Sequence, residues 1–563
     1  QHPTEIQHLV ARMLAIPEAH VECVCRRMGG AFGGKESQAA QWACLAALAA
    51  SVTGRPAKMR LDRDDDMIMT GKRHDFRIDY DVGFDGKGRL VGVDVDLASR
   101  CGCSADLSLG VNDRAMFHAD NAYFYPAVHI RSRRVRTNTV SNTAFRGFGG
   151  PQGMMFAERA MDAIAHTLRL DPLDVRKRNL YGPRRNVTPY GMTVDDNIAP
   201  ALIEELEHSS DYRRRRQAVS AFNAENAFLK KGLALTPAKF GIAFTLMHLN
   251  QAGALVHVYT DGSVQVNHGG TEMGQGVYIK VAQVVAEVFG IDIERVRITA
   301  TTTSKVPNTT PTAASSGSDL NGMAASRAAE AIKRRMADVA AKVFDAERSA
   351  VTFAHNRVFA GNREMSFGDL ARNAFLARVP LSATGFYATP RISWNRERRE
   401  GRPFFYFAYG AACSEVTVDI TTGEMRVDRV DILHDVGRSL NPAVDMGQIE
   451  GGFVQGMGWL TTEELVFDAD GRLATHAPST YKIPTASDVP EDFRVSLWRS
   501  KGNRQPTIYR SKAVGEPPLM LALSVFHAIY DAIGSTSASR EPVPLEAPAT
   551  PENILKALHA LRG

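Results

Sequence analysis

One carboxylate near the end of the sequence stands in a stiff local frame that suits acid–base chemistry. Glu516 in SKAVGEPPLMLA follows Gly515 and precedes Pro517 and Pro518. The first proline is expected to push Glu516 out of the α region, and the second fits the first turn of a helix over the following apolar run. A carboxylate so restricted can serve as a general base, although a helix-capping or surface acid explains the same local sequence.

Glycine-rich loops are scattered along the chain: RMGGAFGGKE (27–36), AFRGFGG (144–150), GGTEMGQG (269–276), PTAASSGSD (311–319) and EGGFVQGMG (450–458). Glycine lets successive backbone amides approach an anion or a ring edge. None of the loops fits a Walker A loop or a dinucleotide fingerprint. Gln275 and Gln455 add amides that both donate and accept, with a structural loop hydrogen bond as an equal alternative. Together the loops indicate a bulky polar cofactor, while a tight turn explains any single one.

Composition narrows the classes of function. The formal net charge is only +5 over 563 residues, and the basic run at residues 213–216 is interpreted as a solvated helix face, not a nucleic-acid site. The six cysteines form no CxxC pair, and no zinc or iron–sulfur pattern is visible. The absence of any run of eighteen apolar residues predicts that no segment spans a membrane.

The chemistry-bearing residues must be positioned by alternating hairpins and helices. Paired strands are predicted in RIDYDVGFDGKGRLVGVDVDLAS, ALVHVYTDGSVQVNHGG and SEVTVDITTGEMRVDRVDIL. Helical periodicity is strong over residues 37–52, 151–167 and 277–289, and Asp171 before Pro172 is expected to cap another helix. The predicted class is therefore α+β. A polar, helix-prone segment from residue 206 predicts a boundary between domains 1–205 and 206–563.

The glycine loops, together with NTAFRGFGGPQGM, VPNTTPTAAS, PSTYKIP and SKAVGEPPL, resemble the molybdenum-binding portion of the xanthine dehydrogenase/oxidase family. The resemblance runs in consistent order from Gln1 to about Glu552. It implies two elongated mixed domains, molybdenum-binding domains I and II, with the cofactor at their interface. It also implies that the N-terminal part of domain I precedes Gln1. The implied cofactor is molybdopterin bearing an oxo-sulfido molybdenum, and the protein supplies no direct metal ligand.

The resemblance assigns cofactor and catalytic roles residue by residue. The residues implied to bind the cofactor are Gln1, Phe32, Gly33, Arg146, Gln275, Ala313, Ala314 and Gln455. Those implied to lie nearest the metal are Gln1, Phe32, Gly33, Arg146 and Glu516. Glu516 resembles the general base, and Arg114 and Glu36 are the other implied catalytic residues.

The same resemblance identifies a substrate site. Glu36 and Arg114 match an acid and a guanidinium that grip the polar edges of a purine, with a helix-start acid and a surface arginine as the alternatives. Phe148 and Phe244 match two rings that sandwich a planar substrate, and Thr245 supplies a hydroxyl nearby; without the resemblance both phenylalanines would be interpreted as core. The family's aldehyde oxidases carry apolar residues in place of Glu36 and Arg114. This sequence departs from the family pattern at Gly110, where the mammalian members of the family carry a serine near the substrate.

These assignments imply a purine hydroxylase that converts hypoxanthine to xanthine and xanthine to urate. Its electrons would pass to two [2Fe-2S] clusters and FAD on a partner subunit, in a cytoplasmic heterotetramer, with NAD as the final acceptor. Two alternatives stay open. One is a molybdenum hydroxylase for aldehydes or another N-heterocycle, and the other is a catalytically silent scaffold subunit.

Overall fold

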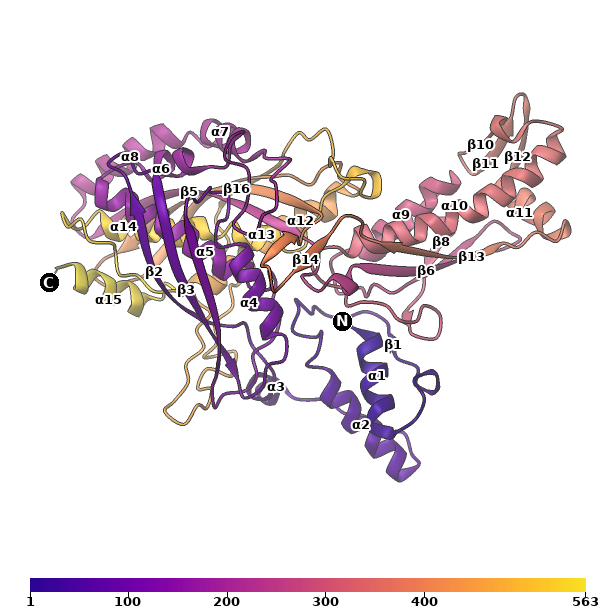
Figure 1. The fold of residues 1–563 in the computed structure, drawn as a ribbon, viewed down its shortest axis with the longest axis horizontal. Helices are drawn as coiled ribbons and strands as arrows, with labels where there is room; N and C mark the ends of the chain where they lie inside the picture. Colours follow the sequence, from indigo (N-terminus) through magenta and orange to yellow (C-terminus); the bar gives the residue numbers. More distant parts are fainter. Residues whose placement is uncertain (563) are drawn as a thin grey trace.

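The chain folds into three connected bodies in the computed structural model, which describes residues 1–562. A large body carries two sheets, an arm carries a third sheet and the long helix α10 (Gly317–Phe344), and a small lobe holds α1 (Pro3–Leu14) and α2 (Ala40–Thr53) (Figure 1). The N-terminus lies where the three bodies meet. The predicted α+β class is confirmed.

The first sheet of the large body has the strand order β18-β17-β16-β5. Its strands are β5 (Leu229–Ile242), β16 (Tyr406–Asp419), β17 (Met425–His434) and β18 (Asp492–Leu497). Ala408 and Ala412 of β16 pack in one core with α14 (Leu523–Gly534), whereas Phe407 and Tyr409 pack in the opposite core with α7 (Ala199–Ser209). The strand reads as an unbroken apolar run because both of its faces are covered.

The second sheet of the large body pairs β2 (Phe76–Phe84), β3 (Leu90–Gly102) and β4 (Val128–Arg136). The predicted hairpin is β2-β3, and β4 joins parallel to β3. The helix α5 (Gly150–Leu168) packs against this sheet, and α4 (Ser108–Phe117) packs against α5. Asp171 caps α6 (Pro172–Asn179) as expected, since its side chain accepts the amide of Leu173 at 2.8 Å.

The sheet of the arm has the order β13-β6-β7-β8. Its strands are β6 (Gln251–Val258), β7 (Val264–His268), β8 (Val296–Ile298) and β13 (Ser382–Ala388), and the predicted hairpin is β6-β7. The valine face of α9 (Val277–Phe289) is buried, and an alanine-rich face of α10 lies against β6 and β13. Small side chains let α10 approach closely, since a Cβ at Gly385 of β13 would lie 2.0 Å from the Ala324 carbonyl oxygen.

The remaining helices and strands are β1 (Val24–Cys25), α3 (Arg63–Met69), α8 (Tyr212–Glu225), β9 (Thr301–Thr302), β10 (Val351–Ala354), β11 (Arg357–Ala360), β12 (Arg363–Ser366), α11 (Phe367–Leu376), β14 (Ser393–Asn395), β15 (Glu400–Arg402), α12 (Pro442–Thr461), α13 (Pro517–Met520) and α15 (Pro551–Arg562). Among them β10, β11 and β12 form a small sheet, β14 pairs with β15, and β1 pairs with β9. The predicted boundary between residues 205 and 206 falls within α7, and the division at that point stays a prediction.

The interpretation of the basic run as a solvated face is wrong for two of its arginines. Arg215 forms ion pairs with Glu415 and Asp431 at 2.9 and 2.8 Å, and its side chain is only 9% exposed. Arg216 pairs with Asp531 at 2.5 Å. These contacts hold α8 against β16, β17 and α14, so one face of the basic run packs against the protein and the other faces solvent.

The predicted backbone conformation of Glu516, outside the helical region, is also wrong. Glu516 lies in the right-handed helical region at φ −104° and ψ −40°, and α13 begins at Pro517 itself. The preference before proline is local, and tertiary hydrogen bonds to Glu516 override it. By length and composition the stretch Pro517–Gly534 is apolar enough to cross a membrane, yet 94% of it is buried inside the structure as a core element.

Candidate active site

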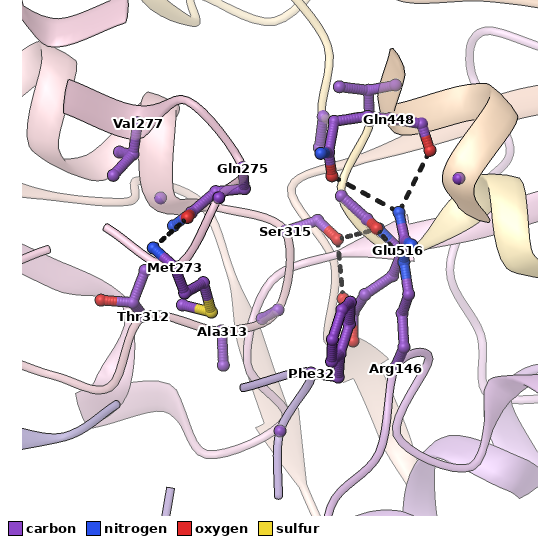
Figure 2. Close-up of a pocket in the computed structure, with 18 of the residues that line it drawn as sticks. Phe32, Arg146, Met273, Gln275, Val277, Thr312, Ala313, Ser315, Gln448 and Glu516 are labelled. Atoms are coloured by element: carbon purple, nitrogen blue, oxygen red, sulfur yellow. Dashed lines mark hydrogen bonds between the residues drawn. The ribbon is translucent and has the colours of Figure 1, made fainter. Parts of the chain in front are cut away.

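A single pocket of about 730 Å³ collects every residue assigned to the site from sequence. It lies between segments of the lobe, the arm and the large body. Gln275, Met273 and Ala313 stand on one side of it, and Glu516, Arg146 and Phe32 stand on the other (Figure 2). The residues brought together are Gln1, Phe32, Gly33, Glu36, Arg114, Arg146, Phe148, Phe244, Thr245, Gln275, Ala313, Ala314, Gln455 and Glu516. Their individual roles stay predictions.

Both carboxylate oxygens of Glu516 are held by hydrogen bonds. The Ser315 hydroxyl donates to Oε2 at 2.8 Å, and the Gly147 amide donates to Oε1 at 3.1 Å. The Ser315 oxygen also accepts the Glu516 backbone N–H at 2.7 Å. A carboxylate fixed at both oxygens and at its own amide keeps one orientation at the pocket wall, as a general base requires.

The guanidinium of Arg146 supports this arrangement from the opposite side. Its Nε donates to the Gly515 carbonyl at 2.5 Å, and its two terminal nitrogens reach Gln455 Oε1 and the Gln448 carbonyl at 3.2 Å each. The Gly515 carbonyl and the Glu516 N–H belong to one planar peptide unit. Arg146 therefore fixes the peptide that carries Glu516, and it ties this peptide to α12.

Strained backbone gathers at the pocket. Phe32, Phe148, Ala314 and Ser315 all have φ between +50° and +56°, a region that side-chain-bearing residues avoid. Such conformations persist where the surrounding structure enforces them, and they concentrate at functional sites. Here they turn two aromatic rings and one hydroxyl into the pocket wall.

The end of β5 and the last turn of α4 position Arg114 in the pocket wall. The Arg114 Nη1 donates to the Ala243 carbonyl at 2.8 Å, and Nη2 donates to the Gly241 carbonyl. The guanidinium carbon lies 4.4 Å from the centre of the Phe240 ring. The side chain is buried, and Nε has no hydrogen-bond partner among residues 1–562. Burial lowers the pKa of Arg114, and the Glu516 carboxylate opposes that shift.

Glu36 is a second buried charge-bearing group in the pocket. Burial and, next, the charge of Glu516 raise the pKa of Glu36 to about 8. A carboxyl with this pKa is mostly protonated at neutral pH, so it can donate a hydrogen bond to a ligand. Glu36 and Arg114 thus offer a neutral donor and a cationic donor to the same pocket.

The aromatic residues lie beside Arg114. Phe244 lies two residues after the end of β5, and its amide donates to Asn250 Oδ1 at 2.7 Å. The Phe148 ring fills the space beside Gly110, one helical turn before Arg114, because a Cβ there would lie 2.7 Å from Phe148 Cε1. Thr245 Oγ1 would lie 3.7 Å from that same Cβ. A planar ligand between these groups would meet two rings and one hydroxyl.

The predicted cofactor residues differ in how much of their hydrogen bonding is already used. The Gln1 side chain accepts the Gly33 amide at 3.1 Å and donates to the Thr312 carbonyl at 2.8 Å, so it joins the lobe to the arm. The Gln275 side chain accepts the Met273 amide at 2.7 Å and donates to the Thr271 carbonyl at 2.9 Å. These bonds within the loop favour a structural role for the Gln275 oxygen and for one of its two N–H groups. Gln455 accepts from Arg146 and keeps its amino group available.

Sequence reasoning missed several residues of the pocket. Ser315 lies in a glycine-rich loop that the sequence identified, so a hydroxyl beside Ala314 was the available signal. Gln448 lies two residues before another such loop. Lys280 pairs with Asp445 at 2.5 Å, and burial raises the pKa of Asp319 to about 7. Asp319 ends the glycine-rich loop at residues 311–319, whereas Lys280 and Asp445 stand in no identified motif.

Comparison with known proteins identifies the protein class to which this fold belongs. The sequence matches the molybdopterin cofactor-binding domain family over residues 1–180 and 205–490. The structure superposes on quinoline 2-oxidoreductase from Pseudomonas putida 86 with a TM-score of 0.87 at 25% identity, covering 99% of this chain and 71% of that one. For aldehyde oxidoreductase from Desulfovibrio gigas the TM-score is 0.82 at 25% identity, covering 98% and 56%. The fold is that of a molybdenum hydroxylase large subunit.

Curated sequences narrow the class further. The xanthine dehydrogenase/oxidase of Mus musculus is 46% identical over 563 residues, which cover 99% of this chain and 41% of the mouse protein. The xanthine dehydrogenase of Dictyostelium discoideum is 45% identical over 560 residues, covering 98% and 40%. The chain therefore belongs to the molybdopterin-binding domains of the xanthine dehydrogenase family, and it spans about two-fifths of the length of these relatives.

Proposed function

We propose that the chain is the molybdenum-binding part of a xanthine dehydrogenase that oxidises hypoxanthine to xanthine and xanthine to urate. The observation that carries this proposal is that Glu36 and Arg114 share one pocket with Glu516 and with Phe148 and Phe244. A purine presents ring nitrogens and carbonyl oxygens along its edges and flat apolar faces. The pocket offers two polar donors for the edges and two rings for the faces.

The residues present fit a molybdopterin cofactor. Among residues 1–562 no group of three or more His, Cys, Asp or Glu could hold a metal ion, so the donor set suits a cofactor that brings its own metal ligands. Backbone at Gly274 and Gly451 borders open space, since a Cβ there would meet no protein atom within 4 Å. The residues proposed to hold the cofactor are Gln1, Phe32, Gly33, Arg146, Gln275, Ala313, Ala314 and Gln455.

When bound, the cofactor supplies the oxygen nucleophile and accepts two electrons. The residues of the chain do the remaining work. Glu516 takes the proton of the nucleophile while Ser315 and Gly147 hold its carboxylate in place. Arg114 stabilises the negative charge that develops on the purine during attack. Glu36 donates a hydrogen bond to an acceptor atom of the purine, and Phe148 and Phe244 hold the flat purine ring in one orientation.

The rest of the proposed enzyme lies outside these residues. We propose that [2Fe-2S] clusters and FAD on a partner subunit carry the electrons to NAD, in a cytoplasmic heterotetramer. The curated relatives are longer proteins, and this chain matches only about two-fifths of their length, which supports a larger enzyme.

The decisive experiment measures molybdenum content and turnover on the purified complex. Hypoxanthine, xanthine and benzaldehyde are compared as substrates, with NAD and oxygen as alternative acceptors. We expect stoichiometric molybdenum and turnover of both purines well above that of the aldehyde. Full molybdenum with turnover of the aldehyde alone, or with no turnover, would overturn the proposal in favour of an aldehyde hydroxylase or a silent scaffold.

The raised pKa of Glu36 predicts an alkaline limit to purine binding. Glu36 is protonated below about pH 8 and loses its donor proton as the pH rises through that value. The kcat/KM for hypoxanthine in the parent protein should therefore fall above about pH 8. Glu36→Gln keeps a donor at every pH and should remove this fall. An unchanged alkaline limb in Glu36→Gln would contradict the assignment.

Gly110 predicts a steric effect on the substrate slot. In Gly110→Ala the new Cβ would lie 2.7 Å from Phe148 Cε1, so the ring must move. We expect KM for hypoxanthine to rise by about tenfold with molybdenum content unchanged, since small misfits in a shaped pocket cost about 1–3 kcal/mol. Gly86→Ala is the matched control because its Cβ would meet nothing within 4 Å. Equal KM values in the two variants would refute the prediction.

A further inference from the structure

Arg73 is a buried cation that no motif identified. It lies three residues before β2 and forms an isolated bridge with Thr143. Its guanidinium carbon stands 4.4 Å from the centre of the Phe145 ring and 5.0 Å from that of Trp459 on α12. Among residues 1–562 it forms no ion pair within 4.0 Å, and its Nη1 is buried without a hydrogen-bond partner. The charge is therefore held by aromatic faces and is not neutralised by direct contact with a carboxylate.

Within the described part of the chain, the one hydrogen bond of the Arg73 side chain reaches the peptide unit whose N–H holds Glu516. Nη2 donates to the Arg146 carbonyl at 3.0 Å. That carbonyl and the Gly147 N–H belong to a single peptide unit, and the Gly147 N–H donates to Glu516 Oε1 at 3.1 Å. Because the unit is planar, a donor that fixes its oxygen also fixes the direction of its N–H. A cation at the oxygen also polarises the unit and strengthens the hydrogen bond at the other end.

We propose that Arg73 is a positioning residue for Glu516, acting through the peptide between Arg146 and Gly147. The inference rests on the proposed function of Glu516 as general base. Arg73 lies outside the pocket lining, whereas Arg146 lines the pocket and holds the neighbouring Gly515–Glu516 peptide. Arg73 thus fixes the Arg146–Gly147 peptide, whose N–H binds the Glu516 carboxylate, and Arg146 fixes the Gly515–Glu516 peptide, which carries the Glu516 backbone. Of these, only Arg73 can be changed without altering a group that faces ligand.

The charge of Arg73 persists at working pH. Burial lowers the pKa of Arg73 to about 10, with Glu463, Tyr481 and Glu516 opposing the shift. Arg73 therefore keeps a cationic donor at the Arg146 carbonyl at neutral pH.

The test compares Arg73→Met and Arg73→Lys with the matched control Arg77→Met, whose arginine is 81% exposed in β2. Each complex is assayed for kcat and KM with hypoxanthine, for molybdenum content, and for urate binding by calorimetry. In Arg73→Met we expect kcat to fall about 10- to 100-fold, since misplacement near the chemistry is costly even from a distance. KM, urate affinity and molybdenum content should stay within about twofold of the parent.

Arg73→Lys keeps a cationic donor for the Arg146 carbonyl and should recover most of the lost turnover, and Arg77→Met should match the parent. A loss of turnover that follows a matching loss of molybdenum or urate affinity would show that Arg73 acts only in packing. Parent-like kcat in Arg73→Met, with Glu516→Gln inactive, would overturn this inference alone. Parent-like turnover in Glu516→Gln would instead overturn the proposed function.

Discussion

Replacing Glu516 with glutamine is expected to lower purine turnover by at least about 100-fold, because general-base catalysis contributes about 10²- to 10⁴-fold. Glutamine has nearly the same shape, but its amide cannot take a proton. Only one side-chain oxygen remains for the two donors that now converge on the carboxylate, the Ser315 hydroxyl and the Gly147 amide. KM should change little, since the proposed purine contacts come from other residues.

Three measurements separate lost chemistry from lost structure in this variant. Molybdenum content and urate affinity should match the parent, and Glu205→Gln on the exposed face of α7 controls for loss of a carboxylate. Ser315→Ala removes the donor to Oε2 and the acceptor of the Glu516 N–H but leaves the carboxylate itself, so we expect a smaller loss, about tenfold. Turnover of Glu516→Gln near that of the parent would remove Glu516 as the base.

The parts of the site that the sequence predicted are those encoded in short, contiguous motifs. Gly33, Phe148 and Ala314 stand in glycine-rich loops, and positive φ at these residues explains why the loops have unusual compositions. The three predicted hairpins were recognisable for the same reason, since alternation and turn residues are local signals.

The parts that could not be predicted depend on contacts between distant segments. Arg146 reaches the Gly515 carbonyl across 369 positions, and Gln1 reaches Thr312 across 311. No local pattern specifies such pairs, because they form only after the sheets and helices have packed. Arg73 is the clearest case, since its environment combines Phe145, Trp459 and the Arg146 carbonyl.

Two errors in the sequence interpretation have the same physical origin. The polar residues around Arg215 in the sequence predicted that it faces solvent, yet it is buried in ion pairs with carboxylates on β16 and β17. Glu516 was expected outside the helical region, yet Ser315 and Gly147 hold it inside. In both residues a local preference worth about 1 kcal/mol is overridden by two or more charge-assisted hydrogen bonds of about 1.5–3 kcal/mol each.

Replacing Arg114 with methionine is expected to lower kcat by about 100- to 1,000-fold, the range seen when one preorganised donor to a developing charge is removed. The guanidinium is fixed before substrate arrives, by the Gly241 and Ala243 carbonyls and by the Phe240 ring. A purine gains negative charge only as it is attacked, so the guanidinium interacts more strongly with the transition state than with the ground state.

KM should therefore change by only a few-fold in Arg114→Met, which distinguishes this residue from one that merely binds substrate. The variant also leaves two buried carbonyls without donors, at a cost of about 1–3 kcal/mol each, so molybdenum content and thermal unfolding are measured alongside. Arg114→Lys keeps the charge but not the fork of donors, and it should fall between parent and Arg114→Met. Arg131→Met, in an exposed pair with Asp96, should match the parent. A rise in KM with kcat unchanged would assign Arg114 to uniform binding and not to the transition state.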